Sequence, residues 1–462
     1  MTTTPRHRAD EVNEAEHPPL HGAGSSAGDD RLPSTPKLQV ALDLLILDRA
    51  LGIAAEAAAG GAEILEVGTP LLKSEGLDAV RALHEQHPSL PIVADTKTMD
   101  AGRTEMEMAA KAGASFATVL GLASNSTIRE CVEVGKNYGI SVVVDLVGHP
   151  DPVARAREAA DLGAAIVGVH CPIDEQMEGK DPFDTLRAVR AAVDIQVAVA
   201  GGIHGGSAAE AASAGADIVI VGGAISKAPD ARQATESLAT ALRGGIPVHN
   251  PDEFKRYDNT ALVEAFSRVS TPNISDAMHR GGAMQGLTPL LQGAHVVGRA
   301  VTCRTYPGDW AKPVEAIDAA QPGDVLVIDA GGRPPAVWGE LATESCIQRK
   351  IAAVIIDGAI RDVDAIRGLN FPAWSRQQVP NAWEPKGFGE IGTPIICGGQ
   401  RVSPGDWIIG DDSGLVVVPA GRAVEVANRA NDVLEMENRV RGEIQAGSTL
   451  SQVAQLYRWE KS

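Results

Sequence analysis

Short apolar runs alternate with helical patterns along the first half of the chain, from residue 37 to residue 243. Nearly every position in these runs is apolar, so both faces of each strand are predicted to be buried, as in a parallel sheet. An Ala-rich amphipathic stretch follows each run. Eight βα units in about 200 residues predict a closed (β/α)8 barrel, and an open doubly wound sheet is the alternative. The predicted strands are Leu38–Leu42, Ile64–Val67, Ile92–Ala94, Phe116–Leu120, Val142–Val144, Ile166–Val169, Val197–Ala200 and Ile218–Val221.

The alternation of strand and helix patterns ends in the second half of the chain. Residues 244–259, with prolines, asparagines and charges, are predicted to be a linker, and residues 260–462 a second domain. A helix is predicted over Trp338–Arg349, and a long polar amphipathic helix over residues 421–443 that lies on a surface or against a partner subunit. The Pro-, Gly- and Ser-rich residues 1–36 are predicted to be a disordered tail. Strands are predicted at Ala300–Tyr306, Val325–Asp329, Ala353–Ile356, Pro394–Cys397 and Leu415–Val418.

The composition of the chain argues against several classes of protein. The formal net charge of −19 argues against a nucleic-acid-binding surface, which requires a basic face. The 5 cysteines are scattered and form no CxxC pair, so a reducing cytoplasm is expected rather than a disulfide framework. No apolar run approaches the length of a membrane span, and the N-terminus lacks a signal-peptide core. We expect a cytoplasmic protein that contacts neither nucleic acid nor membrane.

Polar residues gather where the predicted barrel strands end. Barrel enzymes place their sites at the carboxyl ends of the strands, so these residues are expected to share one mouth. Asp145 either joins the site or only braces the mouth, and His170 is either a proton-transfer residue or a core histidine. The strand-end residues are Asp43, Glu66, Asp95, Lys97, Asp145 and His170.

Two glycine pairs follow the last two predicted strands: Gly201-Gly202 and Gly222-Gly223. Glycines let backbone N–H groups approach an anion closely. Barrels often hold phosphate after strands seven and eight, so both pairs are candidate phosphate-binding turns.

The stretch Asp95-Thr-Lys97-Thr-Met-Asp100 is similar to the DxKxxD motif of the orotidine-monophosphate decarboxylase suprafamily. Within it, the resemblance is closest to the hexulose-phosphate synthase branch, through segments such as Glu66-Val-Gly-Thr-Pro70 and Val221-Gly-Gly-Ala-Ile225. The related keto-gulonate-phosphate decarboxylases carry an arginine where this chain has Gly223. That difference favours the synthase branch, although the decarboxylase remains the alternative.

The resemblance implies condensation of formaldehyde with ribulose 5-phosphate through an enediolate. It implies Glu66 and Asp95 as ligands of Mg²⁺ or Mn²⁺, and Lys97 as a fixed positive charge beside the enediolate. His170 would be the general acid or base, because an imidazole titrates near neutral pH. Asp43 would orient the sugar hydroxyls or Lys97. Asp100 would reach into a neighbouring subunit's site, so a homo-oligomer is implied.

The second domain carries its own resemblance. Glu340 and Arg361 are separated by twenty residues, and Asp362 follows, as in the D-x20-R-D motif of the RraA-like family. That family implies a swivelling β/β/α sandwich that forms trimers or hexamers, acting either as an oxo-acid aldolase or as a protein-binding regulator of a ribonuclease. As an aldolase, Arg361 would clamp a carboxylate and Asp362 would hold the metal. Glu340 stands where the aldolases have aspartate.

Overall fold

The computed structural model describes residues 35–244, 246–247 and 256–454. The tail predicted over residues 1–36 therefore lies outside the described residues, apart from Thr35 and Pro36. The predicted linker is described only at its two ends.

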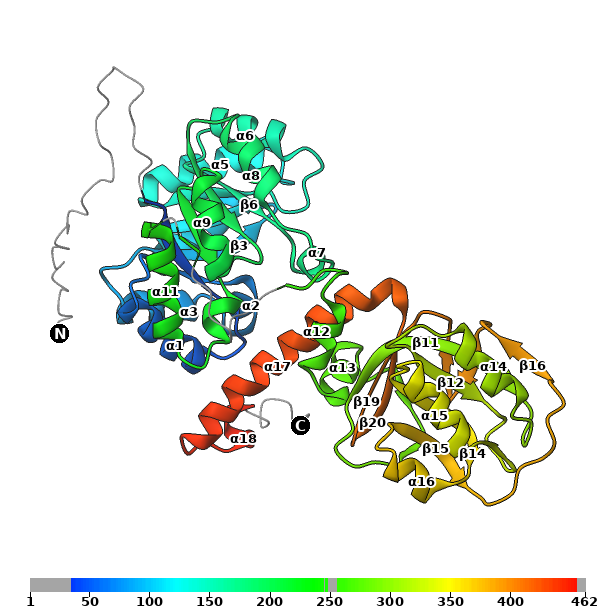
Figure 1. Ribbon diagram of the computed structural model, residues 1–462. Helices are drawn as coiled ribbons and strands as arrows, with labels where there is room; N and C mark the ends of the chain where they lie inside the picture. Colours follow the sequence, from blue (N-terminus) through cyan, green and yellow to red (C-terminus); the bar gives the residue numbers. More distant parts are fainter. Residues whose placement is uncertain (1–34, 245, 248–255, 455–462) are drawn as a thin grey trace, which may run out of the picture. The chain divides into compact units, whose positions relative to one another are not determined.

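The first half of the chain forms a closed barrel of eight parallel strands in sequence order, surrounded by helices (Figure 1). Strand β1 pairs with β8 in parallel, with Lys37 opposite Ile218, and this pairing closes the sheet. The predicted barrel is confirmed, and the open doubly wound alternative is wrong. The strands are β1 Lys37–Leu42, β2 Ile64–Val67, β3 Ile92–Thr98, β4 Phe116–Leu120, β5 Ser141–Asp145, β6 Ile166–His170, β7 Gln196–Ala200 and β8 Ile218–Val221.

Alternation along each strand divides the apolar residues between two layers. In β3, Val93 belongs to a cluster inside the barrel, whereas Ile92 and Ala94 pack in the larger core beneath the helices. Successive side chains of a strand point to opposite faces, so the residue two positions after Val93 also faces the interior. That residue is Asp95, which places its carboxylate at the barrel mouth.

The helices of the barrel are positioned by local capping. Helix α5, for example, begins after Ser124, whose hydroxyl accepts a hydrogen bond from the Thr127 N–H, and it ends at Gly139 with φ 73°. The helices are α1 Leu47–Ala59, α2 Thr69–Glu75, α3 Asp78–Gln86, α4 Gly102–Lys111, α5 Asn125–Tyr138, α6 Pro152–Asp161, α7 Ile173–Met177, α8 Phe183–Arg190, α9 Gly205–Ser213, α10 Gly223–Ser226 and α11 Ala231–Gly244.

The second half forms a separate domain around a mixed sheet (Figure 1). Its main path runs β10-β15-β14-β12-β11-β19-β20-β9, with β13 beside β14 and β16 beside β11, and β17 and β18 form a small ribbon. The strands are β9 Ala283–Met284, β10 Thr288–Pro289, β11 Val296–Thr305, β12 Val325–Asp329, β13 Ala336–Trp338, β14 Ala353–Ile360, β15 Ala373–Gln378, β16 Gly389–Ile391, β17 Ile395–Cys397, β18 Gln400–Val402, β19 Trp407–Asp411 and β20 Gly414–Val418.

The five strands predicted in this domain are all present. The predicted helix over Trp338–Arg349 is shorter, because Trp338 ends strand β13. The helices are α12 Leu262–Ser267, α13 Thr271–Ala277, α14 Ala311–Ala319, α15 Glu340–Gln348, α16 Val363–Gly368, α17 Ala423–Gln445 and α18 Leu450–Val453, with a 3-10 turn at Ala420–Arg422.

Helix α17 is the long amphipathic helix that the sequence predicts. Its apolar face packs in a core cluster with Phe266 and Trp407 of the second domain. Its charged face meets the barrel of the same chain: Arg439 lies 3.2 Å from Glu56, and Glu443 lies 2.7 Å from Arg49. The helix therefore joins the two halves of the chain.

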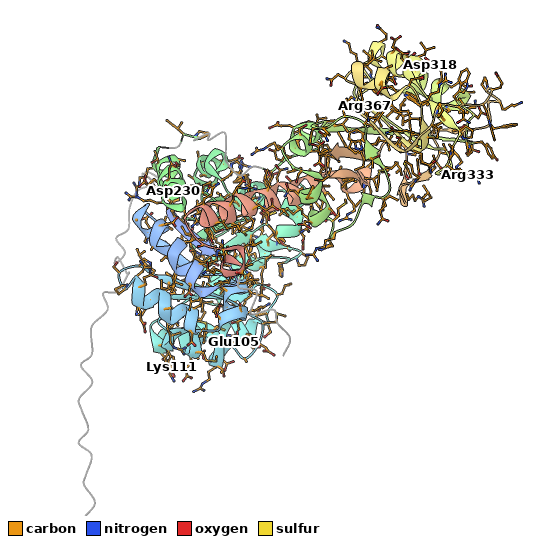
Figure 2. The ribbon with its side chains drawn as sticks, turned by 90° about the horizontal axis from the view of Figure 1, so that it is seen from below. Glu105, Lys111, Asp230, Asp318, Arg333 and Arg367 are labelled. Carbon is orange, nitrogen blue, oxygen red and sulfur yellow. The ribbon has the colours of Figure 1, made fainter. Side chains whose placement is uncertain are left out.

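Charged side chains are exposed on both domains. Figure 2 shows exposed side chains such as Lys111 on the barrel, and Asp318 and Arg367 on the second domain, pointing outward. Among the described residues, no helix is both long and apolar enough to cross a bilayer.

Candidate active site

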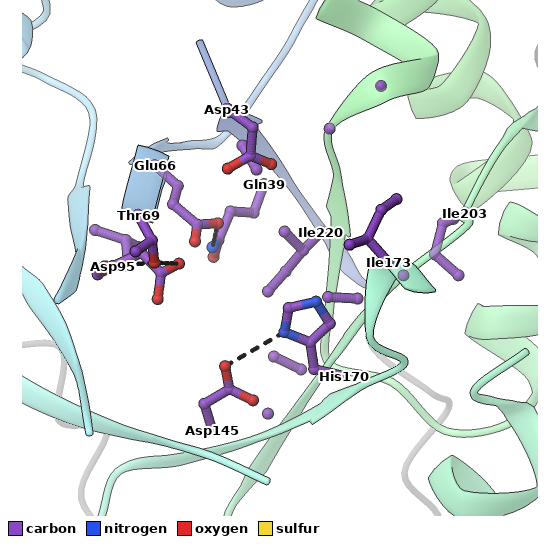
Figure 3. Close-up of a pocket in the computed structure, with 18 of the residues that line it drawn as sticks. Gln39, Asp43, Glu66, Thr69, Asp95, Asp145, His170, Ile173, Ile203 and Ile220 are labelled. Carbon is purple, nitrogen blue, oxygen red and sulfur yellow. Dashed lines mark hydrogen bonds and ion pairs between the residues drawn. The ribbon is translucent and has the colours of Figure 1, made fainter. Parts of the chain in front are cut away.

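A cavity of about 620 Å³ opens at the carboxyl ends of the barrel strands. Asp43, Glu66 and Asp95 lie on one side of it, and Asp145 and His170 lie together on another (Figure 3). The predicted mouth is therefore a real pocket. The predicted site residues that line it are Asp43, Glu66, Asp95, Lys97, His170, Gly201, Gly202, Gly222 and Gly223.

An irregularity in β3 aims Asp95 and Lys97 into this pocket. The pairing of β3 with β4 shifts register between Ala94 and Thr98, and Lys97 has φ 46°, which is left-handed backbone. Thr118 of β4 fixes the distortion: its hydroxyl accepts from the Lys97 N–H at 2.9 Å and donates to the Asp95 carboxylate at 2.7 Å. Such strain at a pocket wall is typical of functional sites.

Lys97 lies between two carboxylates. Its ammonium is 3.1 Å from Asp95 and 2.7 Å from Asp145. Burial alone would lower the pKa of Lys97, but the charges of Asp145 and Asp95 raise it above its ordinary value. The pocket therefore holds a permanent positive charge that cannot act as a base near neutral pH.

Asp145 connects Lys97 to His170, so the structure brings it into the site. Burial opposes its ionisation, yet the hydrogen bond and charge of His170, together with Lys97, bring the pKa of Asp145 down to about 2. Asp145 Oδ2 is 3.3 Å from His170 Nδ1. An ionised carboxylate accepts hydrogen bonds only, so Nδ1 must be the protonated nitrogen. The imidazole then has Nε2 available to accept a proton, which favours a catalytic over a core histidine.

Glu66 and Asp95 form the carboxylate pair. Glu66 is buried and accepts a hydrogen bond from Gln39 at 2.7 Å, while Asp95 accepts one from the Thr69 hydroxyl at 2.7 Å. Burial and the charges of Asp95 and Asp43 raise the pKa of Glu66 well above its ordinary value. Desolvation at the pocket wall and the charge of Asp95 raise the pKa of Asp43, although this residue is exposed. Three carboxylates thus crowd one another, and a cation would relieve their repulsion.

This donor set fits a hard divalent ion. In the part of the chain that the structure describes, no group of three or more His, Cys, Asp or Glu residues is arranged to hold a metal alone. Mg²⁺, however, is commonly bound through one or two carboxylates, with water and substrate oxygens completing its shell. Glu66 and Asp95 supply that number of carboxylates.

The glycine pairs line the same pocket. Gly201 and Gly202 follow β7 with φ values of 104° and 72°, which disfavour any residue with a side chain. A Cβ on Gly201 would also lie 2.5 Å from the Cys171 carbonyl oxygen. The turn therefore requires glycine there.

Asp100 lies apart from the other predicted residues. It is exposed after the end of β3 and does not line the pocket. Sequence reasoning missed Gln39, Thr69 and Thr118, which orient the acidic residues. Gln39 and Thr118 are polar positions inside otherwise apolar strands, and this was the available signal.

The second domain has a smaller cavity of about 270 Å³. It is lined by the three predicted residues Glu340, Arg361 and Asp362. Asp362 Oδ2 lies 3.4 Å from Arg361 Nε and accepts the Glu340 N–H at 3.3 Å. Asp362 itself has φ 55°, so left-handed backbone turns its carboxylate into this position. The motif residues therefore meet in one place.

A closed parallel barrel with carboxylates, a lysine and a histidine at its carboxyl mouth defines the class of (β/α)8-barrel enzymes. Residues 36–238 match the model of the family "Orotidine 5'-phosphate decarboxylase / HUMPS family", and residues 271–417 match "RraA-like: Aldolase/RraA". The chain belongs to the orotidine 5'-phosphate decarboxylase / HUMPS family, and it carries an RraA-like domain in its second half.

Curated relatives match the barrel half. The chain is 40% identical over 206 residues to a 3-hexulose-6-phosphate synthase of Mycobacterium gastri, which covers 45% of this chain and 99% of the relative. It is 39% identical over 201 residues to the enzyme of that name from Methylomonas aminofaciens, covering 43% and 96%. The barrel half is accordingly an enzyme of the carbon–carbon lyase type.

One solved structure of an RraA protein is similar to part of this chain. The crystal structure of Streptomyces coelicolor RraAS2, described as an unusual member of the RNase ES inhibitor RraA protein family, is 30% identical. It covers 41% of this chain and 100% of that chain, with a TM-score of 0.37.

Proposed function

We propose that the barrel catalyses the reversible condensation of formaldehyde with D-ribulose 5-phosphate to D-arabino-hex-3-ulose 6-phosphate. The observation that carries this proposal is the contact chain Lys97–Asp145–His170 beside the carboxylate pair Glu66 and Asp95. Such a set suits proton removal next to a ketone, because a base and fixed positive charge are both at hand. The relatives named 3-hexulose-6-phosphate synthase support the choice of substrates.

In the proposed reaction, His170 Nε2 takes a proton from C1 of ribulose 5-phosphate, next to the C2 ketone. The resulting enediolate is stabilised by the ammonium of Lys97, which the two neighbouring carboxylates keep protonated. C1 then forms a bond to the formaldehyde carbon, and the formaldehyde oxygen takes the proton back from His170. Asp145 holds the imidazole in the required tautomer throughout.

Glu66 and Asp95 would hold Mg²⁺ or Mn²⁺, which when bound supplies a Lewis acid for the substrate oxygens. Gln39 and Thr69 position these two carboxylates. Asp43, at the same wall, would orient sugar hydroxyls. The glycine turns after β7 and β8 would face the phosphate.

The test is formaldehyde consumption by the purified chain with ribulose 5-phosphate and Mg²⁺. Wild-type protein is expected to consume formaldehyde, and Lys97→Ala is expected to lose this activity while remaining folded. If formaldehyde is not consumed and 3-keto-gulonate 6-phosphate is decarboxylated instead, the decarboxylase alternative replaces this proposal. Gly223, at the position of the decarboxylases' arginine, argues against that result.

For the second domain we propose an oxo-acid aldolase site at Arg361, Asp362 and Glu340. The observation that supports it is that all three residues line one cavity. Pyruvate release from 4-hydroxy-4-methyl-2-oxoglutarate, lost in Arg361→Ala, would establish it. Absence of turnover, with capture of a ribonuclease by the intact chain, would instead assign a regulatory role to this domain.

A further inference from the structure

The barrel pocket is completed by residues from outside the barrel. Arg256, which precedes α12, lines the cavity together with Asp432 and Met436 of α17. Sequence reasoning gave no sign of this, because Asp432 and the barrel strands are far apart in the chain. Helix α17 is thus part of the wall of the candidate active site.

Carboxylates of α17 pair with three of the cationic side chains that line the pocket. Apart from Lys97, those lining it within the described residues are Arg49, Lys227 and Arg256. Each is paired with a carboxylate of α17: Arg49 with Glu443 at 2.7 Å, Lys227 with Asp432, and Arg256 with Asp432 at 3.7 Å. Helix α17 therefore neutralises these cations from the second domain.

Two of these cations lie where the anionic group of a substrate is expected. Lys227 immediately follows α10, which begins at Gly223, and both Gly222 and Gly223 line the pocket. The side chains of Lys227 and Arg256 are only 17% and 12% exposed. A poorly hydrated ammonium and guanidinium side by side suit a phosphate monoester, which has two negative charges and several acceptor oxygens.

A further carboxylate of α17, that of Glu435, lies near these ion pairs. Glu435 lies one residue from Met436, and its buried Oε2 has no hydrogen-bond partner within the described residues. Burial, and to a lesser extent the charge of Asp432, raise the pKa of Glu435 to about 7, although the charges of Lys227 and Arg256 act to lower it. The carboxylates of Glu435 and Asp432 repel each other when both are ionised. This repulsion offsets part of the stabilisation that Asp432 gains from its two cationic partners.

We propose that Asp432 is a built-in competitor of the substrate phosphate for Lys227 and Arg256. In this arrangement a phosphate monoester binds the two cations only when Asp432 moves aside, so the second domain sets the phosphate affinity of the barrel. This inference rests on the proposed function, because it assigns a phosphate ligand to that pocket. It gives the fusion of the two domains a physical consequence at the active site.

The experiment compares Asp432→Asn with wild type as full-length chains. Asn keeps the shape of the side chain but removes the competing charge. The affinity for inorganic phosphate, measured by calorimetric titration, is expected to rise about threefold to tenfold, as for loss of one partly exposed ion pair. The KM for ribulose 5-phosphate should fall by a similar factor. Lys227→Met should weaken both.

Asp174→Asn is the matched control. It removes another ion pair of α17 with the barrel, Arg429–Asp174 at 2.8 Å, but neither residue lines the pocket. Phosphate affinity should stay at the wild-type value in this variant. An equal rise in both variants would mean that loosening of α17 is the cause, and would overturn the proposal.

Unchanged or weakened phosphate binding in Asp432→Asn would also overturn it, since Asp432 would then only position Lys227. The phosphate titration separates this inference from the proposed function. A chain that consumes no formaldehyde refutes the reaction, while the phosphate titrations of wild type and the three variants still decide the role of Asp432.

Discussion

The Asp145 carboxylate lies 2.7 Å from the Lys97 ammonium, although the two residues are 48 positions apart in the chain. This contact helps to keep Lys97 charged, and together with His170 it keeps Asp145 ionised. It also defines which nitrogen of His170 carries the proton. The contact is thus the element on which the proposed proton transfer depends.

Asp145→Asn is expected to reduce turnover more than substrate binding. The amide keeps the size of the carboxylate but can donate to His170 Nδ1, which would favour the wrong tautomer. We expect kcat for formaldehyde consumption to fall about 100-fold, the usual scale of lost general acid–base catalysis. Steady-state kinetics measures this, with Asp174→Asn as an exposed control. A variant with wild-type kcat would show that Asp145 only braces the barrel mouth.

The Glu66 and Asp95 pair predicts a metal-dependent stabilisation. A ligand that binds only the folded chain raises its thermal midpoint as its concentration rises. We therefore expect Mg²⁺ to raise the midpoint of wild type, and Glu66→Gln to lose most of this response. Glu130→Gln, on the exposed side of α5, is the matched control and should respond as wild type. An equal Mg²⁺ response in Glu66→Gln would place the ion elsewhere.

The position of Asp100 predicts that each active site contains residues from two chains. It is exposed and outside the pocket of its own chain, as expected of a residue that acts in a neighbour's site. Asp100→Asn and His170→Ala should each be inactive alone. After mixing and subunit exchange, some sites would combine an intact Asp100 with an intact His170, so activity should return. Failure to recover activity, with exchange verified by differently tagged chains, would mean that Asp100 acts within its own chain or not at all.

The barrel could be predicted from the sequence because its strands are buried on both faces and therefore read as continuous apolar runs. The location of the site could also be predicted, because the carboxyl ends of all strands in a closed parallel barrel lie at one mouth. Short strands of the second domain, such as β16 Gly389–Ile391 with its exposed residues, carry no such pattern. The spacing of Asp95 and Lys97 correctly predicted that they face one pocket, but it could not reveal the left-handed backbone at Lys97. Arg256 and Asp432 enter the pocket only through the packing of α17, which local sequence does not encode.

Glu435 predicts how the stability of the chain depends on pH. Its pKa rises from an ordinary 4.5 to about 7 in the folded chain, chiefly through burial. The folded state therefore binds this proton more tightly than the unfolded state, so stability is full below pH 4.5 and declines as pH rises toward 7. The shift corresponds to about 3 to 4 kcal/mol at most, using about 1.4 kcal/mol for each unit of pKa.

Glu435→Gln should abolish this decline, because the amide remains neutral at every pH and occupies nearly the same volume. At pH 8 the variant is expected to unfold at a higher temperature than wild type, whereas the two should be alike near pH 4.5. Thermal unfolding at a series of pH values measures the difference. Glu425→Gln is a contrasting control: Arg422 lowers the pKa of Glu425, so its loss should destabilise the chain at neutral pH. Parallel pH profiles for wild type and Glu435→Gln would show that the folded chain keeps Glu435 ionised at no cost.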